Sequence, residues 1–411
     1  MAEIVNPALQ PVKAKDRIVF LDILRGFALL GILFANLLTW SGLKYLHIGD
    51  IVHLGNIDID RSIYNNLKFF VDTKFYTLFS ILFGVGFFLQ ISKNRENPGF
   101  PRLYLWRMIL LLILGVIHSI IWSGDILSLY ALMGMVLLAL RNIPVQKTLY
   151  VGLSLFFLPV LLSIIYMYSF AKALPELPKT ALLVYPDMTP QQVTAGFQST
   201  DPWVVLQTNL HSLKYRWLSF IPDGRPFKVL GLFFVGGYLY SIQFFTVHAK
   251  KWKLLVLFLS VGAVFSLASL KIEGNVASYS RNWTDVLDKL LHEIGQISLT
   301  LSYICILAKL VDAFPKFIFF TWLKNYGRMS LTSYLGHTVL SILIFYPVVG
   351  LGYFGNLTLE NTYYVALMIL VIQLLFSNIW FMFFSFGPVE WLWRCATFRK
   401  WFPLRIRRVE V

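Results

Sequence analysis

Ten apolar runs, separated by short polar segments, constrain this chain more than any other feature. They lie at about residues 23–42, 75–92, 107–123, 126–140, 148–170, 228–246, 253–271, 290–311, 329–347 and 363–386. Most reach the roughly 17–25 residues that an α-helix needs to cross a bilayer, although the fourth is short. Only 14% of the residues are charged, against about a quarter in soluble proteins. The sequence therefore predicts an all-α fold, a polytopic membrane helix bundle of about ten transmembrane helices.

The basic residues gather on one side of this predicted bundle. The N-terminus and the segments near 93–107, 141–147, 247–253, 309–328 and 387–411 contain 22 Lys and Arg against 6 Asp and Glu. The opposite segments contain 13 Lys and Arg against 14 Asp and Glu. Since basic loops stay in the cytoplasm, both termini are predicted to be cytoplasmic. Anionic lipid headgroups explain such a basic face, so the charge does not point to nucleic acid.

A single integral-membrane domain is expected over residues 17–386, with outer loops at about 43–74 and 171–227. Residues 1–16 would form a cytoplasmic tail, and residues 387–411 a basic, amphipathic cytoplasmic tail at the membrane interface. In the second outer loop, Asp201 and Pro202 predict the start of an amphipathic helix that continues to Trp217 and lies on the membrane or caps the bundle. Glycines inside the apolar runs, such as Gly84, Gly86 and Gly236, are expected to permit close helix packing.

The first apolar run carries polar side chains on one stripe. Arg25 and Asn36 are eleven residues apart, which is about three helical turns, so they share one face of the helix. His47 follows after eleven more residues. Ionisable groups in a membrane helix are costly and commonly line a pathway or a site. The alternative for Arg25 is a purely structural pair with Asp22, three residues earlier.

Other runs carry polar groups that would face a common interior. Arg107 and His118 lie eleven residues apart in the third run and Asp125 follows it; Glu293 and Gln296 lie in the eighth run, and Ser333 and His337 in the ninth. Such groups avoid lipid, so these helices are expected to face one another. The alternatives are that Arg107 extends to the interface and that the two histidines only bond across helices. No metal site is predicted, because neither these histidines nor the two cysteines have ligand spacing.

Several longer segments together resemble one family. They are RIVFLDILRGFALLGILFANLL, DTKFYTLFSILFGVGFFL, GVIHSIIWSGDILSLYALMG, NYGRMSLTSYLGHTVL and FGPVEWLWR. They look like the signature stretches of the YeiB-like bacterial membrane proteins, and the resemblance runs from about residue 17 to the tail. It implies a location in the bacterial plasma membrane. Members of that family have mostly been described as uncharacterised or as transporters.

The start of the chain also resembles the transmembrane acyltransferases, notably heparan-α-glucosaminide N-acetyltransferase. Their Leu-Asp-x-x-Arg-Gly motif is matched by Leu21, Asp22, Arg25 and Gly26, their functional asparagine by Asn36 and their catalytic histidine by His47. The Gly-Asp-Ile-Leu turn at 124–127 resembles another shared position. The glycine-rich step and the Trp-Asn-Gly stretch that flank the family's histidine are absent, which leaves His53 as a second possibility.

This second resemblance implies transfer of an acyl group from cytosolic acyl-CoA, with acetyl-CoA as donor, to an outer glycan, lipid or small-sugar acceptor. His47 would act as general base and Asn36 would bind the thioester oxygen; an acyl-histidine intermediate is an alternative. The acyl-CoA-binding residues would be those of the cytoplasmic mouth: Arg17, Asp22, Arg25, Arg102, Arg107, Lys324 and Arg328. The supporting polar pathway would comprise His118, Asp125, Glu293, Gln296, Ser333 and His337.

Two other classes of function fit the same polar runs. A secondary transporter of a small anion or metabolite also needs buried polar stripes, although the chain lacks paired interrupted helices in two matching halves. A non-catalytic scaffold would not require the polar groups in the first, third, eighth and ninth runs.

Overall fold

The computed structural model describes residues 18–46, 54–55, 57–169, 188–220, 223–272 and 283–406. Over these ranges the chain is mainly helical, and an isolated β-bridge joins Phe384 and Arg405. The α-helices are α1 (Val19–Trp40), α3 (Ile57–Asn66), α4 (Lys74–Lys93), α5 (Phe100–Ile121), α6 (Leu127–Ala139), α7 (Val145–Ser169), α8 (Pro190–Phe197), α9 (Pro202–Phe220), α10 (Arg225–Ser241), α11 (Trp252–Ile272), α12 (Trp283–Ala313), α13 (Ile318–Arg328), α14 (Ser330–Phe345), α15 (Leu359–Phe383) and α16 (Pro388–Phe398). A short 3-10 turn, η2 (Leu43–Tyr45), follows α1, and a π-helical turn, η3 (Leu67–Val71), follows α3.

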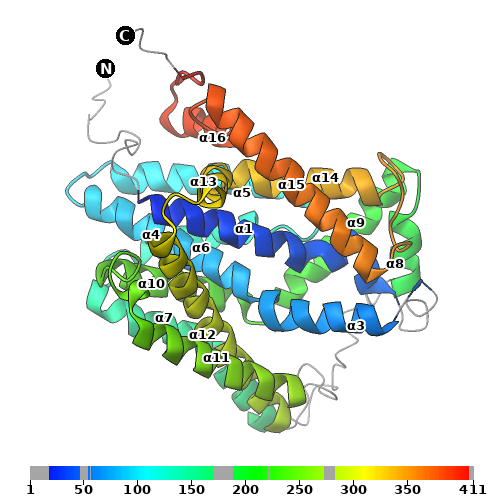
Figure 1. Ribbon diagram of the computed structural model, residues 1–411, viewed down its shortest axis with the longest axis horizontal. Coiled ribbons are helices and arrows are strands. Elements are labelled where there is room, and N and C mark those ends of the chain that lie inside the picture. The colour runs from blue at the N-terminus through cyan, green and yellow to red at the C-terminus, as the bar shows by residue number, and fades with distance from the viewer. Residues whose placement is uncertain are drawn as a thin grey trace.

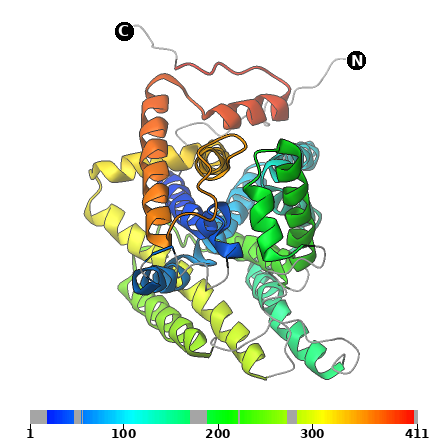
Figure 2. The same ribbon diagram turned by 90° about the vertical axis from the view of Figure 1, so that its right-hand side faces the viewer.

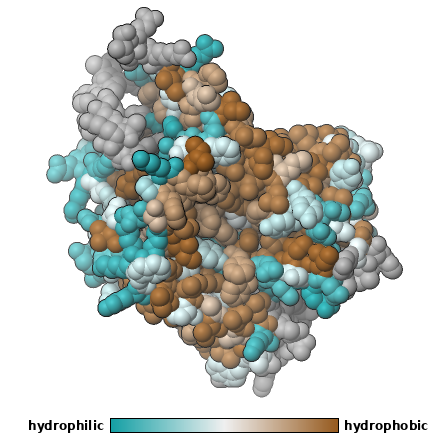
Figure 3. Space-filling model, viewed as in Figure 1, coloured by the Kyte–Doolittle hydropathy of each residue, from teal (hydrophilic) through white to brown (hydrophobic). Residues whose placement is uncertain are grey.

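The prediction of an all-helical, multi-pass membrane protein is confirmed in outline. Seven helical segments are long and apolar enough to cross a membrane: Val19–Trp40, Asp58–Lys93, Phe100–Ile121, Val145–Ile165, Trp252–Ile272, Trp283–Ala313 and Leu359–Phe383. The other three apolar runs coincide with the shorter helices α6, α10 and α14. In Figure 3 a broad apolar area separates polar side chains at the left and right margins of the molecule.

Helix α1 lies in the middle of the bundle and is covered by α4, α13, α14 and α15 (Figure 1). Its apolar side chains Leu24, Leu29 and Leu33 are completely buried. A side-chain carbon at Gly327 of α13 would fall on the carbonyl oxygen of Asp22, so the two backbones touch. Such contact between small residues is a common way for membrane helices to pack.

The two ends of the bundle differ in composition. Helices α3 and α8 lie at the right-hand end in Figure 1, where the Asp60 carboxylate accepts hydrogen bonds from the first N–H groups of α15. Helix α15 runs from there to the opposite end, where α16 follows it. Figure 2 shows α16 at the top of the bundle, beyond the upper end of α15 and roughly perpendicular to it. The loops predicted on the outer side and the basic C-terminal segment therefore lie at opposite ends.

Helix α9 confirms the amphipathic helix predicted to start at Asp201, whose carboxylate accepts a hydrogen bond from the Trp203 N–H at 2.8 Å. Its polar face packs inward: the Asn209 amide oxygen accepts from the Ser123 N–H at 2.7 Å. Trp203 and Trp217, on the predicted apolar stripe, stay exposed. The helix therefore caps the end of α5 and turns its apolar stripe outward.

The expectation for the glycines is confirmed at two positions and wrong at a third. Side-chain carbons at Gly84 and Gly236 would overlap carbonyl groups of α10 and α4, so these glycines permit close contact of the two helices. A carbon at Gly86 would meet only the Arg25 Nη2 atom, at 3.9 Å. Gly86 therefore faces the space beside the Arg25 side chain and does not contact the backbone of another helix.

Candidate functional site

A cavity of about 660 Å³ follows α1 along its length. From α1 and the turn after it, the lining residues are Ile18, Leu21, Asp22, Arg25, Ile32, Ala35, Asn36, Leu38, Thr39 and Lys44. At about 1.5 Å per helical residue, the α1 part of this wall is roughly 30 Å long. The opposite walls come from α4, α5, α6, α9, α10, α13, α14, α15 and α16. Arg25 and Asn36, which the eleven-residue spacing places on one stripe, both lie on this wall.

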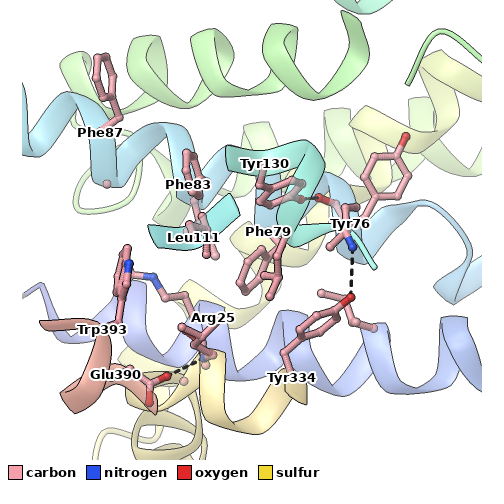
Figure 4. Close-up of a pocket in the computed structure, with 18 of the residues that line it drawn as sticks. Arg25, Tyr76, Phe79, Phe83, Phe87, Leu111, Tyr130, Tyr334, Glu390 and Trp393 are labelled. Atoms are coloured by element: carbon pink, nitrogen blue, oxygen red, sulfur yellow. Dashed lines mark hydrogen bonds between the residues drawn. The ribbon is translucent and has the colours of Figure 1, made fainter. Parts of the chain in front are cut away.

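Charged residues line the cavity unequally. The basic ones are Arg25, Lys44, Arg107, Arg216, Arg225, Arg328 and Arg394, and the acidic ones are Asp22, Asp72 and Glu390. Figure 4 shows Arg25, Glu390 and Trp393 at one end of the pocket, Leu111 and Phe79 between, and Tyr76 toward the other end. An excess of cations around a cavity favours anionic ligands.

Arg25 lies opposite Gly86 and is anchored within its own helix. Its Nη1 donates to Asp22 Oδ1 at 2.7 Å, and its side chain stays 30% exposed, toward the cavity. The local pair expected from the sequence therefore exists. It fixes the guanidinium at the cavity wall and leaves further N–H donors available for a ligand.

Arg107 also belongs to the cavity wall. Its guanidinium lies over the Trp393 ring at 4.6 Å and donates to the Gln90 amide oxygen. Trp393 in turn donates its indole N–H to the Arg107 carbonyl oxygen at 3.4 Å. This stacking joins α5 to α16 and aims a planar cation into the cavity.

Helix α16, part of the segment predicted only as an interfacial tail, closes the same end. Glu390 accepts hydrogen bonds from the Leu331 N–H at 2.6 Å, the Thr332 N–H at 3.0 Å and the Thr332 hydroxyl at 2.6 Å. Its carboxylate thus caps the start of α14. Burial raises the pKa of the Glu390 carboxyl, although these hydrogen bonds oppose the shift. The stretch FGPVEWLWR stands out in the sequence only through its resemblance to the YeiB-like family, and nothing in it indicates a capping role.

Replacing Glu390 with alanine should release α16, because three hydrogen bonds are lost at once. Cys395 of α16 is 7% exposed in the folded chain, whereas Cys305 in α12 is fully buried. In a protein that also carries Cys305→Ser, we expect Glu390→Ala to make maleimide labelling of Cys395 about tenfold faster. Glu96→Ala, at an exposed position, should label at the original rate. Equal labelling of both variants would contradict the capping role.

Asn36 lies midway along the cavity. Its Nδ2 donates to the Ile32 carbonyl oxygen at 3.1 Å. The second N–H and the amide oxygen have no protein partner within the described ranges, and the side chain lines the cavity. The residue therefore has an unused donor for a ligand oxygen.

His118 and Asp125 form a structural link beside the cavity. Asp125 Oδ1 lies 2.8 Å from His118 Nδ1, and the other ring nitrogen lies 3.0 Å from the Thr338 hydroxyl. Asp125 also accepts from the Leu127 and Ser128 N–H groups at the start of α6. Both histidine nitrogens are occupied and neither residue lines the cavity. This link joins α5, α6 and α14.

Glu293 and Gln296 lie in a second cluster, between α12, α10 and α4. The Glu293 carboxylate pairs with the Lys228 ammonium, and the Gln296 amide donates to the Tyr76 hydroxyl at 3.0 Å. Lys228 was not among the predicted residues, because pairing between α10 and α12 is not visible in the sequence. Of this cluster only Tyr76 lines the cavity.

Ser333 and His337 lie in a third cluster on α14. His337 Nε2 lies 2.5 Å from the Tyr326 hydroxyl, which also donates to Gln373 Oε1 at 3.0 Å. The Gln373 amide donates to the Ser333 carbonyl oxygen. The expected common polar interior is found only in part: Arg25, Asn36 and Arg107 line the cavity. The other polar groups, His118, Glu293, Gln296, Ser333 and His337, lie beside it and bond between neighbouring helices.

The remaining predicted residues divide into three groups. Arg328 lines the cavity, and its guanidinium lies 3.9 Å from the Phe381 ring centre. Arg102 and Lys324 do not line it. Arg17, His47 and His53 lie outside the described residues. The sequence did not indicate Lys44, Arg216, Arg225 and Arg394 as site residues, because they lie in the loops or tail.

Comparison with known proteins places the chain in a family. Residues 239–400 match the family "Protein of unknown function (DUF418)", a range that includes Arg328, Glu390 and Trp393 of the cavity wall. The chain is 31% identical to "Uncharacterized protein YxaH" of Bacillus subtilis (strain 168), over 97% of this chain and 98% of that protein. It is 26% identical to "Uncharacterized protein YeiB" of Escherichia coli (strain K12), over 93% and 97% of the two chains. The chain therefore belongs to the YeiB-like family.

Proposed function

We propose that this chain is a membrane-bound acyltransferase that moves an acetyl or other acyl group from cytosolic acyl-CoA to an acceptor outside the cytoplasm. In this proposal the ten apolar runs, including the shorter helices α6, α10 and α14, all span the plasma membrane. Both termini are then cytoplasmic, and the α16 end of the cavity faces the cytosol, in agreement with the distribution of basic residues.

The observation that carries the proposal is the course of the cavity. It begins among Arg25, Arg107 and Arg328, passes Asn36 and reaches Lys44 beyond the end of α1. Arginine forks suit the phosphates of a nucleotide such as CoA. A thioester extended along α1 would place its carbonyl near Asn36. His47 follows Lys44 by three residues in the sequence.

The proposed chemistry is a direct transfer. His47 takes the proton from the acceptor's hydroxyl or amine group. At the same time the oxygen or nitrogen atom of the acceptor attacks the carbonyl carbon of the thioester. Asn36 donates its free N–H to the developing oxyanion. The carbon–sulfur bond then breaks, and the CoA thiolate leaves and takes up the proton.

Binding and turnover of radiolabelled acetyl-CoA by the protein in nanodiscs test this proposal. We expect Arg25→Ala to weaken binding at least tenfold, because a charged hydrogen bond contributes about 1.5–3 kcal/mol. His47→Ala should keep binding and lose thioester cleavage. Lys253→Ala, at an exposed position on α11, serves as the matched basic control. Absence of acyl-CoA binding at saturating concentration would remove the acyltransferase proposal.

A secondary transporter is the second candidate, because basic residues line the cavity at both ends. A transporter would exchange labelled acetate or acetyl phosphate across proteoliposomes in the absence of any acyl-CoA. Covalent transfer without such exchange favours the enzyme.

A further inference from the structure

Three basic side chains meet at the end of the cavity away from α16. Lys44 lies in the turn η2 after α1, Arg216 in the second half of α9, and Arg225 at the first residue of α10. All three line the cavity. They come from segments that are far apart in the sequence, so the fold brings them together. We refer to these residues as the outer cation cluster.

The cationic groups of this cluster have no carboxylate partner within the described part of the chain. Lys44 forms neither a hydrogen bond nor an ion pair there, and its side chain is exposed toward the cavity. The buried Nε of Arg216 has no hydrogen-bond partner. Three cations that remain unpaired around one enclosed space are costly, unless an anion binds among them.

Aromatic rings hold the two arginines without using their N–H donors. The Arg216 guanidinium lies 5.1 Å from the centre of the Phe220 ring. Arg225 lies 5.2 Å from the Tyr76 ring and 5.8 Å from the Phe220 ring. Contacts with ring faces are cation–π interactions, which leave the in-plane N–H groups free. The guanidinium groups are therefore positioned and still able to bind an anion with two donors each.

The titration of Lys44 reflects its surroundings. The Lys44 side chain borders the cavity but is surrounded by protein, so it loses contact with bulk water. This desolvation, together with the nearby charges of Arg216 and Arg225, lowers the pKa of Lys44 to about 8. Asp223 and Asp72 oppose the shift without cancelling it. Burial and Arg225 also lower the pKa of Arg216. The carboxylates around the cluster therefore do not neutralise it.

We propose that the outer cation cluster binds a phosphate group, and that the acceptor of the acyl group is a phosphate-bearing molecule. A single carboxylate would leave two of the three cations without a counter-charge, whereas a phosphate offers up to two negative charges and several acceptor oxygens. The binding site stands on the cluster alone; its assignment to the acceptor rests on the proposed function. The phosphate belongs to a water-soluble ester or to a lipid headgroup.

Equilibrium dialysis with labelled inorganic phosphate and glycerol 3-phosphate tests the site, using full-length protein in phosphatidylcholine nanodiscs. We expect saturable binding that weakens about tenfold or more in Arg216→Gln or Arg225→Gln, and disappears in the triple variant with Lys44→Gln. Lys253→Gln is the matched control. Arg225→Lys should retain part of the binding, which separates loss of charge from loss of folding. Equal binding to the wild type and the triple variant, or no saturable binding, overturns the site.

A second arm distinguishes the source of the phosphate. In nanodiscs that contain phosphatidylglycerol, a lipid ligand would compete with glycerol 3-phosphate and remain bound to the purified wild type, but not to the triple variant. A soluble ligand would bind equally in both lipids. Acetyl-CoA binding should change less than twofold in Arg225→Gln. Loss of acetyl-CoA binding in Arg225→Gln would overturn the assignment of the phosphate to the acceptor. Absence of acetyl-CoA binding in the wild type and in every variant would overturn the proposed function but not the phosphate site.

The pH dependence supplies a readout specific to Lys44. Its charge is present below a pKa of about 8 in the free protein and is lost above it. Phosphate affinity of the wild type should therefore fall as the pH rises above 8, with the bound anion moving the fall somewhat higher. Lys44→Arg keeps its charge and should flatten this profile. Parallel profiles would contradict a direct contact between Lys44 and the phosphate.

Discussion

Replacing Asp125 with alanine should destabilise the folded protein by about 3–5 kcal/mol. The carboxylate is almost completely buried and satisfies three groups: His118 Nδ1 at 2.8 Å, the Leu127 N–H at 3.1 Å and the Ser128 N–H at 2.9 Å. Without it, a buried imidazole and the first N–H groups of α6 lose their partner together. The change therefore loosens α5, α6 and α14 at once.

Thermal unfolding in detergent measures this effect, with Asp125→Ala, His118→Ala and the double variant forming a cycle. We expect the double variant to be less destabilised than the sum of the two single variants, because the first change already breaks the contact. Asp201→Ala removes an exposed helix cap and should cost only about 1 kcal/mol. Similar melting temperatures for Asp125→Ala and Asp201→Ala would show that the buried link contributes little.

The second large effect is expected at Gly327. Even an alanine side chain would overlap the Asp22 carbonyl oxygen and would lie 2.5 Å from the Gly26 nitrogen. Backbone atoms cannot rotate away, so α13 must separate from α1 at a cost of about 3 kcal/mol or more. The separation would also displace Asp22 and Arg25 from the cavity wall. Gly327→Ala should therefore lose both stability and acyl-CoA binding.

Gly86→Ala is the matched control for this substitution. Its new methyl group would meet only Arg25 Nη2 at an ordinary contact distance of 3.9 Å. Since alanine also favours a helix over glycine, by about 1 kcal/mol, this variant should be at least as stable as the wild type. Yield of folded protein by size-exclusion chromatography separates the two. A stable, monodisperse Gly327→Ala would contradict the close packing of α1 on α13.

Much of the fold follows from hydrophobicity alone. Each predicted apolar run coincides with a helix in the structure. The length and hydropathy that predict such a helix are properties of the run alone. The stripe of Arg25 and Asn36 is likewise a local property of one helix, and both side chains reach the cavity. Partners across helices are not local. Nothing in the spacing of His118 or Glu293 indicates that they would bond to Asp125 and Lys228 in separate clusters.

The roles of the charged residues at the two ends of the cavity could not be predicted from the sequence. Arg216 belongs to an amphipathic helix whose sequence predicts only a surface location, and Lys44 to a loop. Their importance lies in the absence of carboxylate partners among the residues that the structure describes, and this is seen only when the neighbouring elements are in place. The capping role of Glu390 could not be predicted either, because the helix that it caps begins nearly sixty residues earlier in the sequence.

The Asp22–Arg25 and Glu293–Lys228 ion pairs differ in when they can form during synthesis. Asp22 and Arg25 lie within one turn of α1, so their charges offset each other as soon as that helix leaves the ribosome and enters the translocon. Lys228 has to wait for Glu293, which is made only after α11 and the first part of α12. If α10 spans the membrane as proposed, Lys228 lies in its first turn, near the outer surface, where an unpaired cation costs less than the about 2.5–3.5 kcal/mol of the bilayer centre. The pair between α10 and α12 is therefore completed later in synthesis than the pair within α1.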